Sequence, residues 1–263
     1  MNAIRTIVMK EWADVRRNKL VFSVVIGVPL LMVLIPVVML FIMSRAPVNA
    51  SDLEELSGML KNPIFQGMDL RETMQAMMAS NFMVLFLMMP LMVPVTIAAY
   101  SIVGEKITRS LEPLLATPVS TAQLLLGKGL AAAIPGVVMT WVSYVLFLGF
   151  ARLFAASDRV FNVFLNPMWL VAMFVLSPLL TVMAVNVGII VSSRTSDPRA
   201  AEQLGSLIIL PLMVLFIGAM AGFIMLNATT FWLASLLVLL VDAGLLYLGV
   251  TLFQRETILT RWK

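Results

Sequence analysis

The sequence predicts an all-α, multi-pass membrane protein with six transmembrane helices, and two observations support this fold class. Of the 263 residues, 61% are hydrophobic and only 12% are charged. A soluble domain carries about 25% charged residues, so this chain cannot cover a globule of its size with a polar surface. Six segments also reach the length of about 20 apolar residues that a helix needs to cross a bilayer. A soluble enzyme and a disordered protein are therefore excluded.

The six apolar segments belong to one transmembrane domain, residues 1–263. We expect spans at Leu20–Met43, Phe82–Val103, Leu124–Phe150, Met168–Ser192, Leu204–Leu226 and Phe231–Phe253. The external loop 44–81 is too short for a core of its own. Capping-box patterns at Ser51 and Asp69 predict two short surface helices in this loop. Only Asn227–Thr230 separates the last two spans, which predicts a tight hairpin.

Basic residues are distributed unequally between the two sides of the predicted bundle. The segments 1–19, 104–128, 193–203 and 254–263 hold 13 lysines and arginines, whereas the opposite loops hold five. The positive-inside rule then places both termini in the cytoplasm of a cell-membrane protein. The net charge of +4 follows from this topology, so we expect the lipid bilayer as a partner and no nucleic acid.

The chain contains neither cysteine nor histidine, which removes a thiol nucleophile, the commonest metal ligands and the usual general base. The lysine-containing stretch Gly127-Lys128-Gly129 is not a phosphate-binding loop. It lacks the first glycine, at Ala122, and the hydroxyl residue that follows the lysine. We therefore expect no catalytic residue, no metal and no cofactor on this chain, and we expect that it is not an enzyme.

Residues 1–19 form a candidate amphipathic helix. Its apolar positions follow the i, i+3, i+4 spacing of one helix face and are Ile4, Ile7, Val8, Trp12 and Val15. Such a helix is typical of the membrane interface, with Trp12 anchored near the headgroups. The same face is also suited to docking a cytoplasmic partner, and the two interpretations are compatible.

The cytoplasmic loop 104–123 combines helix breaks with an apolar stripe. Pro113 and Pro118 disfavour helix at the residues that precede them. Ser120 and Gln123 form a capping-box pattern that restarts a helix leading into the third span. The stripe consists of Leu111, Leu114, Leu115 and Val119. It must be buried either in lipid or in a groove on a partner protein.

This loop resembles the type-2 ABC-transporter permeases, the membrane-spanning subunits of ABC exporters. The resemblance rests on Glu105 followed by Leu111-Glu112-Pro113-Leu114-Leu115-Ala116-Thr117-Pro118-Val119-Ser120 and then by Gly127-Lys128. Weaker support comes from the stretch between spans four and five that begins at Ser192-Ser193-Arg194 and continues from Asp197 to Gln203, and from the tail that begins at Phe253. The order of six spans also matches, so the resemblance covers the whole chain.

The resemblance implies a division of labour between subunits. Two permeases, identical or different, would pair, and each would be bound by a cytoplasmic ABC ATPase that carries ATP and magnesium. A short coupling helix in the loop would dock on that ATPase and drive alternating access that moves substrate out of the cytoplasm. By motif match, the coupling residues are Glu105, Arg109, Leu111, Glu112, Pro113, Leu114, Leu115 and Pro118. The amphipathic start of the chain resembles the connecting helix of the family.

Asp242 is the one carboxylate at the centre of a predicted span. A charge there costs about 2.5–3.5 kcal/mol, which favours a neutral acid or a paired ion. It is either a cation or proton site, or a partner in an interhelical hydrogen bond with Asn186 or with Ser206.

Two functions rival that of an exporter permease. One is an ion- or proton-coupled secondary transporter that uses Asp242, and the other is a membrane assembly factor that transports nothing. An intramembrane enzyme is least favoured, because no convergent set of polar residues lies in the spans.

Overall fold

The computed structural model describes residues 3–45, 67–108, 120–221, 223–224 and 226–252, and every regular element within them is helical. Among these residues, six helices or continuous runs of helices are long and apolar enough to cross a membrane. They are Lys19–Arg45, Leu70–Ile107, Ala122–Phe154, Asp158–Arg194, Pro198–Met220 and Ala228–Leu248. The predicted fold class, an all-α chain with six spans, is therefore confirmed, although several spans extend beyond their predicted limits.

Each of the first three spans corresponds to a long helix or helix pair. The chain begins with α1 (Ala3–Arg17) and continues into α2 (Lys19–Arg45), α4 (Leu70–Met83), the 3₁₀ turn η2 (Val84–Met88), α5 (Met89–Ile107) and α7 (Thr121–Phe154). The second half contains α8 (Asp158–Phe164), α9 (Pro167–Val171), the π turn η3 (Ala172–Leu176), α10 (Ser177–Arg194), α11 (Pro198–Ser206), the 3₁₀ turn η4 (Leu207–Ile209), α12 (Leu210–Met220) and α13 (Ala228–Leu252).

The second span lies at the centre of the bundle and is the most deeply buried. Its first helix, α4, starts where the sequence predicts, because Asp69 accepts a hydrogen bond from the Glu72 amide and Glu72 accepts one from the Asp69 amide. The prediction that α4 is a short surface helix is wrong. Thr73 and Gln75 are buried against neighbouring helices, so α4 continues without a gap into the span. The capping pattern at Ser51 lies outside the described residues.

Three spans contain an irregular turn, and each turn precedes a proline by a few residues. Pro90 follows η2, Pro178 follows η3 and Pro211 follows η4. Proline lacks an amide hydrogen and its ring clashes with the carbonyl four residues earlier, and in each case that carbonyl belongs to the irregular turn. The local 3₁₀ and π geometry relieves this clash within a membrane helix.

The hairpin between the fifth and sixth spans is wider than predicted. The helix α12 ends at Met220 and α13 begins at Ala228, whereas the sequence predicts only Asn227–Thr230 between the spans. The Gly218 carbonyl accepts hydrogen bonds from two amides beyond α12, and the Asn227 side chain caps α13 through the Thr230 amide at 2.8 Å. Hydropathy does not locate these ends because the residues between the helices are themselves mostly apolar.

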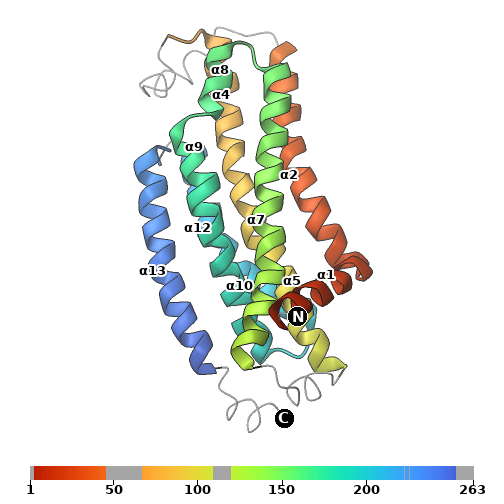
Figure 1. Ribbon diagram of the computed structural model, residues 1–263. Helices are drawn as coiled ribbons and strands as arrows, with labels where there is room; N and C mark the ends of the chain where they lie inside the picture. Colours follow the sequence, from red (N-terminus) through yellow and green to blue (C-terminus); the bar gives the residue numbers. More distant parts are fainter. Residues whose placement is uncertain (1–2, 46–66, 109–119, 222, 225, 253–263) are drawn as a thin grey trace.

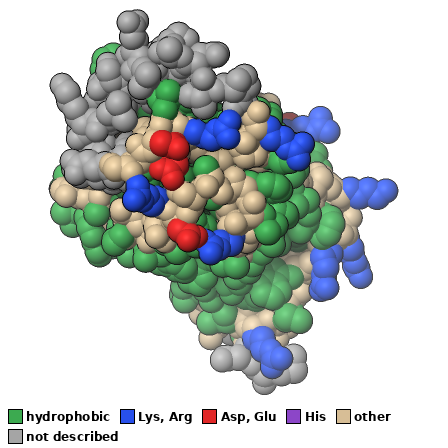
Figure 2. Space-filling view, turned by 90° about the horizontal axis from the view of Figure 1, so that it is seen from above, with side chains coloured by type: hydrophobic (Ala, Val, Ile, Leu, Met, Phe, Trp, Pro, Cys, Tyr) green, Lys and Arg blue, Asp and Glu red, His purple; other side chains and the backbone are tan. Residues whose placement is uncertain are grey.

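Figure 1 shows α1 lying across one end of the bundle, which we call the α1 end, and α8 at the opposite end, the α8 end. The described part of α13 finishes at the α1 end, so α1 and the last helix share a side, as an even number of spans requires. Figure 2 views the α8 end, where charged side chains gather and apolar side chains form the flanks. Exposed flank residues include Leu31, Val145, Val214 and Leu237, which is the surface that a lipid environment requires.

Candidate functional site

Four charged side chains from three helices meet at the α1 end and form what we call the ion cluster: Lys10 and Glu11 of α1, Glu105 of α5 and Lys128 of α7. The Lys128 ammonium lies 2.8 Å from a Glu11 carboxylate oxygen and 2.9 Å from one of Glu105. The Lys10 ammonium lies 2.6 Å from the other Glu105 oxygen. All but Lys10 are buried, with side chains at most 7% exposed.

The apolar face of α1 places this cluster by packing on α7. A Cβ atom on Gly127 would lie 2.8 Å from the Ile7 side chain, so glycine allows the two helices to approach closely. The Trp12 indole donates a hydrogen bond to the Ala131 carbonyl of α7 at 3.0 Å. The predicted amphipathic helix is thus confirmed, and its apolar face lies largely against the bundle.

The surroundings of Glu11 and Lys10 favour the ionised form of each side chain. Burial alone would raise the pKa of Glu11, but the charge and hydrogen bond of Lys128 outweigh it and lower that pKa. Burial alone would lower the pKa of Lys10, but the hydrogen bond to Glu105 and the nearby carboxylates outweigh it and raise that pKa. Ser101 completes the coordination of Lys128 by accepting a hydrogen bond at 2.7 Å.

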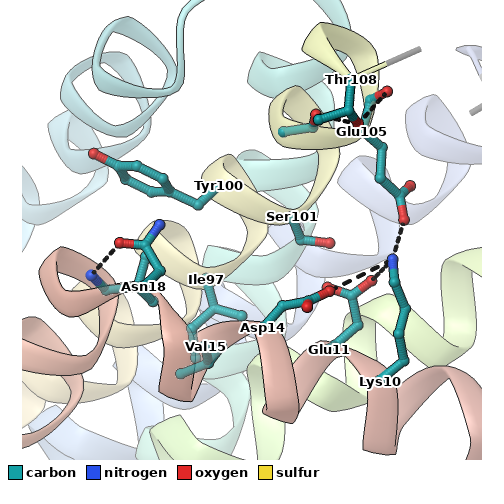
Figure 3. Close-up of a pocket in the computed structure, with 12 residues that line it drawn as sticks. Lys10, Glu11, Asp14, Val15, Asn18, Ile97, Tyr100, Ser101, Glu105 and Thr108 are labelled. Carbon is teal, nitrogen blue, oxygen red and sulfur yellow. Dashed lines mark hydrogen bonds and ion pairs between the residues drawn. The ribbon is translucent and has the colours of Figure 1, made fainter. Parts of the chain in front are cut away.

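A cavity of about 360 Å³ adjoins the cluster between α1, the start of α2 and α5. Figure 3 shows Lys10 reaching from α1 to Glu105, with Asp14 beside it and Tyr100 on the opposite wall. Thr108, which follows the last residue of α5, also lines the cavity. The arrangement holds positive and negative charges in fixed positions, and so it is suited to joining helices.

A second polar junction joins α5 to the connection between α10 and α11. The Lys106 ammonium donates hydrogen bonds to the carbonyls of Ser192 at 2.6 Å and Ser193 at 2.7 Å, and thereby caps the end of α10. About three helical turns earlier on α5, Thr96 donates a hydrogen bond to a Glu202 carboxylate oxygen of α11 at 2.6 Å. The stretch that contains Asp197 and Glu202 thus contacts α5, the helix that also carries Glu105 of the ion cluster.

Of the predicted coupling residues, Glu105 lies in the ion cluster. The others fall outside the described residues and are Arg109, Leu111, Glu112, Pro113, Leu114, Leu115 and Pro118. The two flanks of that segment are described. The helix α5 ends at Ile107, and α7 starts with the predicted capping box, in which Ser120 and Gln123 bond reciprocally at 3.1 and 3.2 Å. The ion cluster therefore includes one residue from each of the two helices that frame the segment, Glu105 of α5 and Lys128 of α7.

The intramembrane pair proposed from the sequence is brought together. Asp242 of α13 is 3% exposed and interacts electrostatically with Asn186 of the neighbouring helix α10. Ser206, the alternative partner, instead donates its hydroxyl hydrogen to the Gln203 carbonyl within its own chain segment.

A comparison with protein families matches residues 5–253 to the ABC-2 family transporter proteins. The chain belongs to the ABC-2 transporter family. It is accordingly a permease subunit of an ABC transporter, and the match extends from α1 into the segment beyond α13. The comparison with curated proteins finds no match.

Sequence reasoning missed three members of the ion cluster in this ABC-2 permease: Lys10, Glu11 and Lys128. Two signals were present in the sequence. Glu11 falls on the apolar stripe of α1, between Val8 and Val15 in the helical repeat, and an acidic residue there requires a buried partner. Lys128 is a second signal, because it interrupts the apolar run that opens α7.

Proposed function

We propose that this ABC-2 permease is the transmembrane subunit of an ABC exporter. It pairs with a second permease and with a separate cytoplasmic ATPase, which binds ATP and magnesium and hydrolyses the nucleotide. The α1 end faces the cytoplasm, and residues 105–120 carry the contact with the ATPase. ATP-driven closure of the ATPase moves this segment and opens a path for substrate out of the cytoplasm by alternating access.

The observation that carries this proposal is the position of the ion cluster at the base of residues 109–119. Glu105 lies on the helix that enters the segment, and Lys128 lies on the helix that leaves it. Their ion pair, together with Glu11, ties both helices to α1. A displacement of the segment is therefore passed to the second and third spans as one unit.

The junction at Lys106 extends this unit across the bundle. Because Lys106 caps the end of α10, a movement of α5 also pulls on the connection to α11. Thr96 adds a second link between α5 and α11 through Glu202. The second span is thus linked by polar contacts to α1, α7, the end of α10 and α11, which fits a role as the central lever.

Docking is tested by co-purification of the ATPase from native membranes in mild detergent. We expect wild type to retain an ATP-hydrolysing subunit and the double variant Leu114→Asp, Leu115→Asp to lose it. Leu153→Asp, an exposed leucine at the far end of α7, is the matched control and keeps the ATPase. Retention in the double variant overturns the assignment of the contact. If no ATPase co-purifies with the wild-type permease, the result favours the assembly factor or the secondary transporter as the function.

Transmission is tested separately from docking with Glu105→Gln. This variant keeps the leucines of the segment but removes one charge from the ion cluster. The chain has no cysteine, so Leu153→Cys provides a single site for a spin label at the α8 end. We expect ATP to change the distance between the labels of two paired permeases, and we expect Glu105→Gln to abolish the change while the ATPase stays bound. An unaltered ATP-dependent change in Glu105→Gln would remove the cluster from the mechanism.

A further inference from the structure

A carboxyl group lies buried between the fourth and sixth spans, on a helix that takes no part in the ion cluster. Asp242 is 3% exposed, and neither of its oxygens has a hydrogen bond of normal geometry within the described residues. The amide nitrogen of Asn186 on α10 is also buried without such a bond among the same residues. The two side chains nevertheless interact with one another. Two mutually complementary groups are therefore adjacent, with little else to satisfy them.

The surroundings of Asp242 lack a compensating charge. The helix α13 packs mainly against α9, η3 and α10, and the one charged residue of those three elements is Arg194. Arg194 lies eight residues beyond Asn186, a distance of about 12 Å along the helix, at the α1 end. On the described part of α13, Tyr247 is the other titratable residue, and it is 72% exposed. No cation in this part of the chain is placed to neutralise a carboxylate at Asp242.

Protonation of Asp242 removes its uncompensated charge and also provides hydrogen bonds for the unsatisfied groups of Asp242 and Asn186. A carboxylic acid has one donor and an acceptor, and a carboxamide has the same pair in matching geometry. The acid hydroxyl of Asp242 can donate to the Asn186 oxygen while its carbonyl accepts from the Asn186 nitrogen. A carboxylate has no hydrogen to donate and would leave an unpaired charge in the apolar region.

We propose that Asp242 is an intramembrane proton-binding site, whose bound proton completes a two-bond acid–amide pair with Asn186 and fastens α13 to α10. The proton is the ligand, and no other cation is required. This inference does not depend on the exporter function, since neither residue takes part in the contact with the ATPase. Loss of the proton would leave a charge between the two spans and remove the donor to the Asn186 oxygen, and it would loosen the sixth span.

Infrared spectroscopy of the full-length permease in lipid reads the proton directly. A carboxylic acid has a carbonyl stretching band that is separate from the bands of a carboxylate. We expect such an acid band at pH 7 in wild type and its loss in Asp242→Asn, which keeps the shape of the side chain. Asp158→Asn is the matched control, because Asp158 is exposed and paired with Arg152, and it leaves the acid band unchanged. The spectrum of Asp242→Asn is subtracted from that of wild type. If the difference contains only carboxylate bands and no acid band, the proposal is overturned.

The pairing with Asn186 has its own readout. In Asn186→Leu the acid band should persist but move to higher frequency, because a carbonyl group without hydrogen bonds vibrates at higher frequency. A band that does not move would show that Asn186 is not the partner. If this variant does not fold, Asn186→Ala, which removes the amide without adding a carboxyl group, is compared for the same shift. Transfer of wild type into deuterated water must also lower the frequency of the band, and a band without this shift would not belong to an acid proton.

Discussion

Lys128 and Glu11 are 117 residues apart in the chain, yet the ammonium of one lies 2.8 Å from the carboxylate of the other. Both side chains are at most 5% exposed. A buried ion pair contributes little more net stability than a well-packed apolar pair, but the loss of one partner leaves an uncompensated buried charge. The bond therefore specifies where α1 lies on α7 more than it stabilises the fold.

The first prediction concerns removal of the lysine that Glu11 and Glu105 share. Lys128→Met keeps the length of the side chain but leaves the two buried carboxylates with only the partly exposed Lys10 as a shared cation. We expect a loss of about 3–5 kcal/mol in the free energy of unfolding, measured by denaturation in detergent micelles. Lys19→Met, at an exposed lysine of α2, should change it by less than about 0.5 kcal/mol. Equal effects in both variants would contradict the structural role of the cluster.

The second prediction concerns acid pH. The pKa of Glu11 is lowered from its ordinary value of 4.5, so its ionised form stabilises the fold above that value and this contribution disappears as the pH falls through the lowered pKa. The pKa of Lys10 is raised from 10.5, so its contribution is present below 10.5 and is lost only at more alkaline pH. The thermal midpoint should be flat around neutrality and fall below about pH 4.5. Glu11→Gln should have a lower midpoint at pH 7 and a shallower fall in acid.

The sequence predicts the elements whose signals are local. The spans follow from apolar runs longer than 20 residues, and the starts of α4 and α7 follow from capping boxes at Asp69 and Ser120. The end of α12 and the length of α4 are not local in this sense. The first depends on the Gly218 carbonyl and the second on burial of residues such as Gln75 by other helices.

In the candidate site too, the residues with a local sequence signal are predicted, and the contacts between helices are not. Glu105 is found because it belongs to a motif, whereas its pairing with Lys10 and Lys128 becomes visible only when three helices converge. Spacing within one helix cannot reveal a partner on another, since the relative rotation and height of the helices are set by packing. The pair of Asp242 and Asn186 is the exception. A lone acid in an apolar span demands a polar neighbour, and few polar residues are available in the other spans.

The third prediction concerns a polar link at the α8 end. The buried Gln75 side chain donates to the carbonyls of Leu40 at 3.1 Å and Phe154 at 2.9 Å, and accepts from the Ala156 amide at 2.7 Å. It thereby joins α4 to the ends of α2 and α7. Gln75→Leu leaves the Ala156 amide without this acceptor and should cost about 1–3 kcal/mol of unfolding free energy in denaturant titrations.

The control for this link is a glutamine with the same chemistry but an exposed side chain. Gln203 on α11 is exposed, and Gln203→Leu should leave the free energy of unfolding within about 0.5 kcal/mol of wild type. Proteolysis at the α8 end gives a second readout, because Gln75→Leu should speed cleavage near Ala156. If Gln75→Leu unfolds at the same denaturant concentration as wild type, the three hydrogen bonds do not hold this end together.

The fourth prediction uses two glycines of the same helix, α7. A Cβ atom on Gly136 would lie 2.6 Å from Cγ of Pro94 on α5, whereas one on Gly149 would meet nothing within 4 Å. The ring of Pro94 cannot rotate away as a flexible side chain would, so Gly136→Ala must push α5 and α7 apart. We expect this change to lower the free energy of unfolding by about 1–3 kcal/mol. Gly149→Ala should raise it by about 0.5–1 kcal/mol, because alanine loses less backbone entropy in a helix than glycine does.

The two glycine variants also separate packing from coupling. If α5 and α7 move as one unit with the segment between them, their close approach at Gly136 must be kept for ATP to alter the far end of α7. Gly136→Ala should therefore reduce the ATP-dependent change in distance between labels at Leu153→Cys, and Gly149→Ala should preserve it. Equal changes in both variants would mean that α5 and α7 transmit movement without this contact. The same spin-label measurement thus connects a 2.6 Å steric limit in the middle of the bundle to movement at its α8 end.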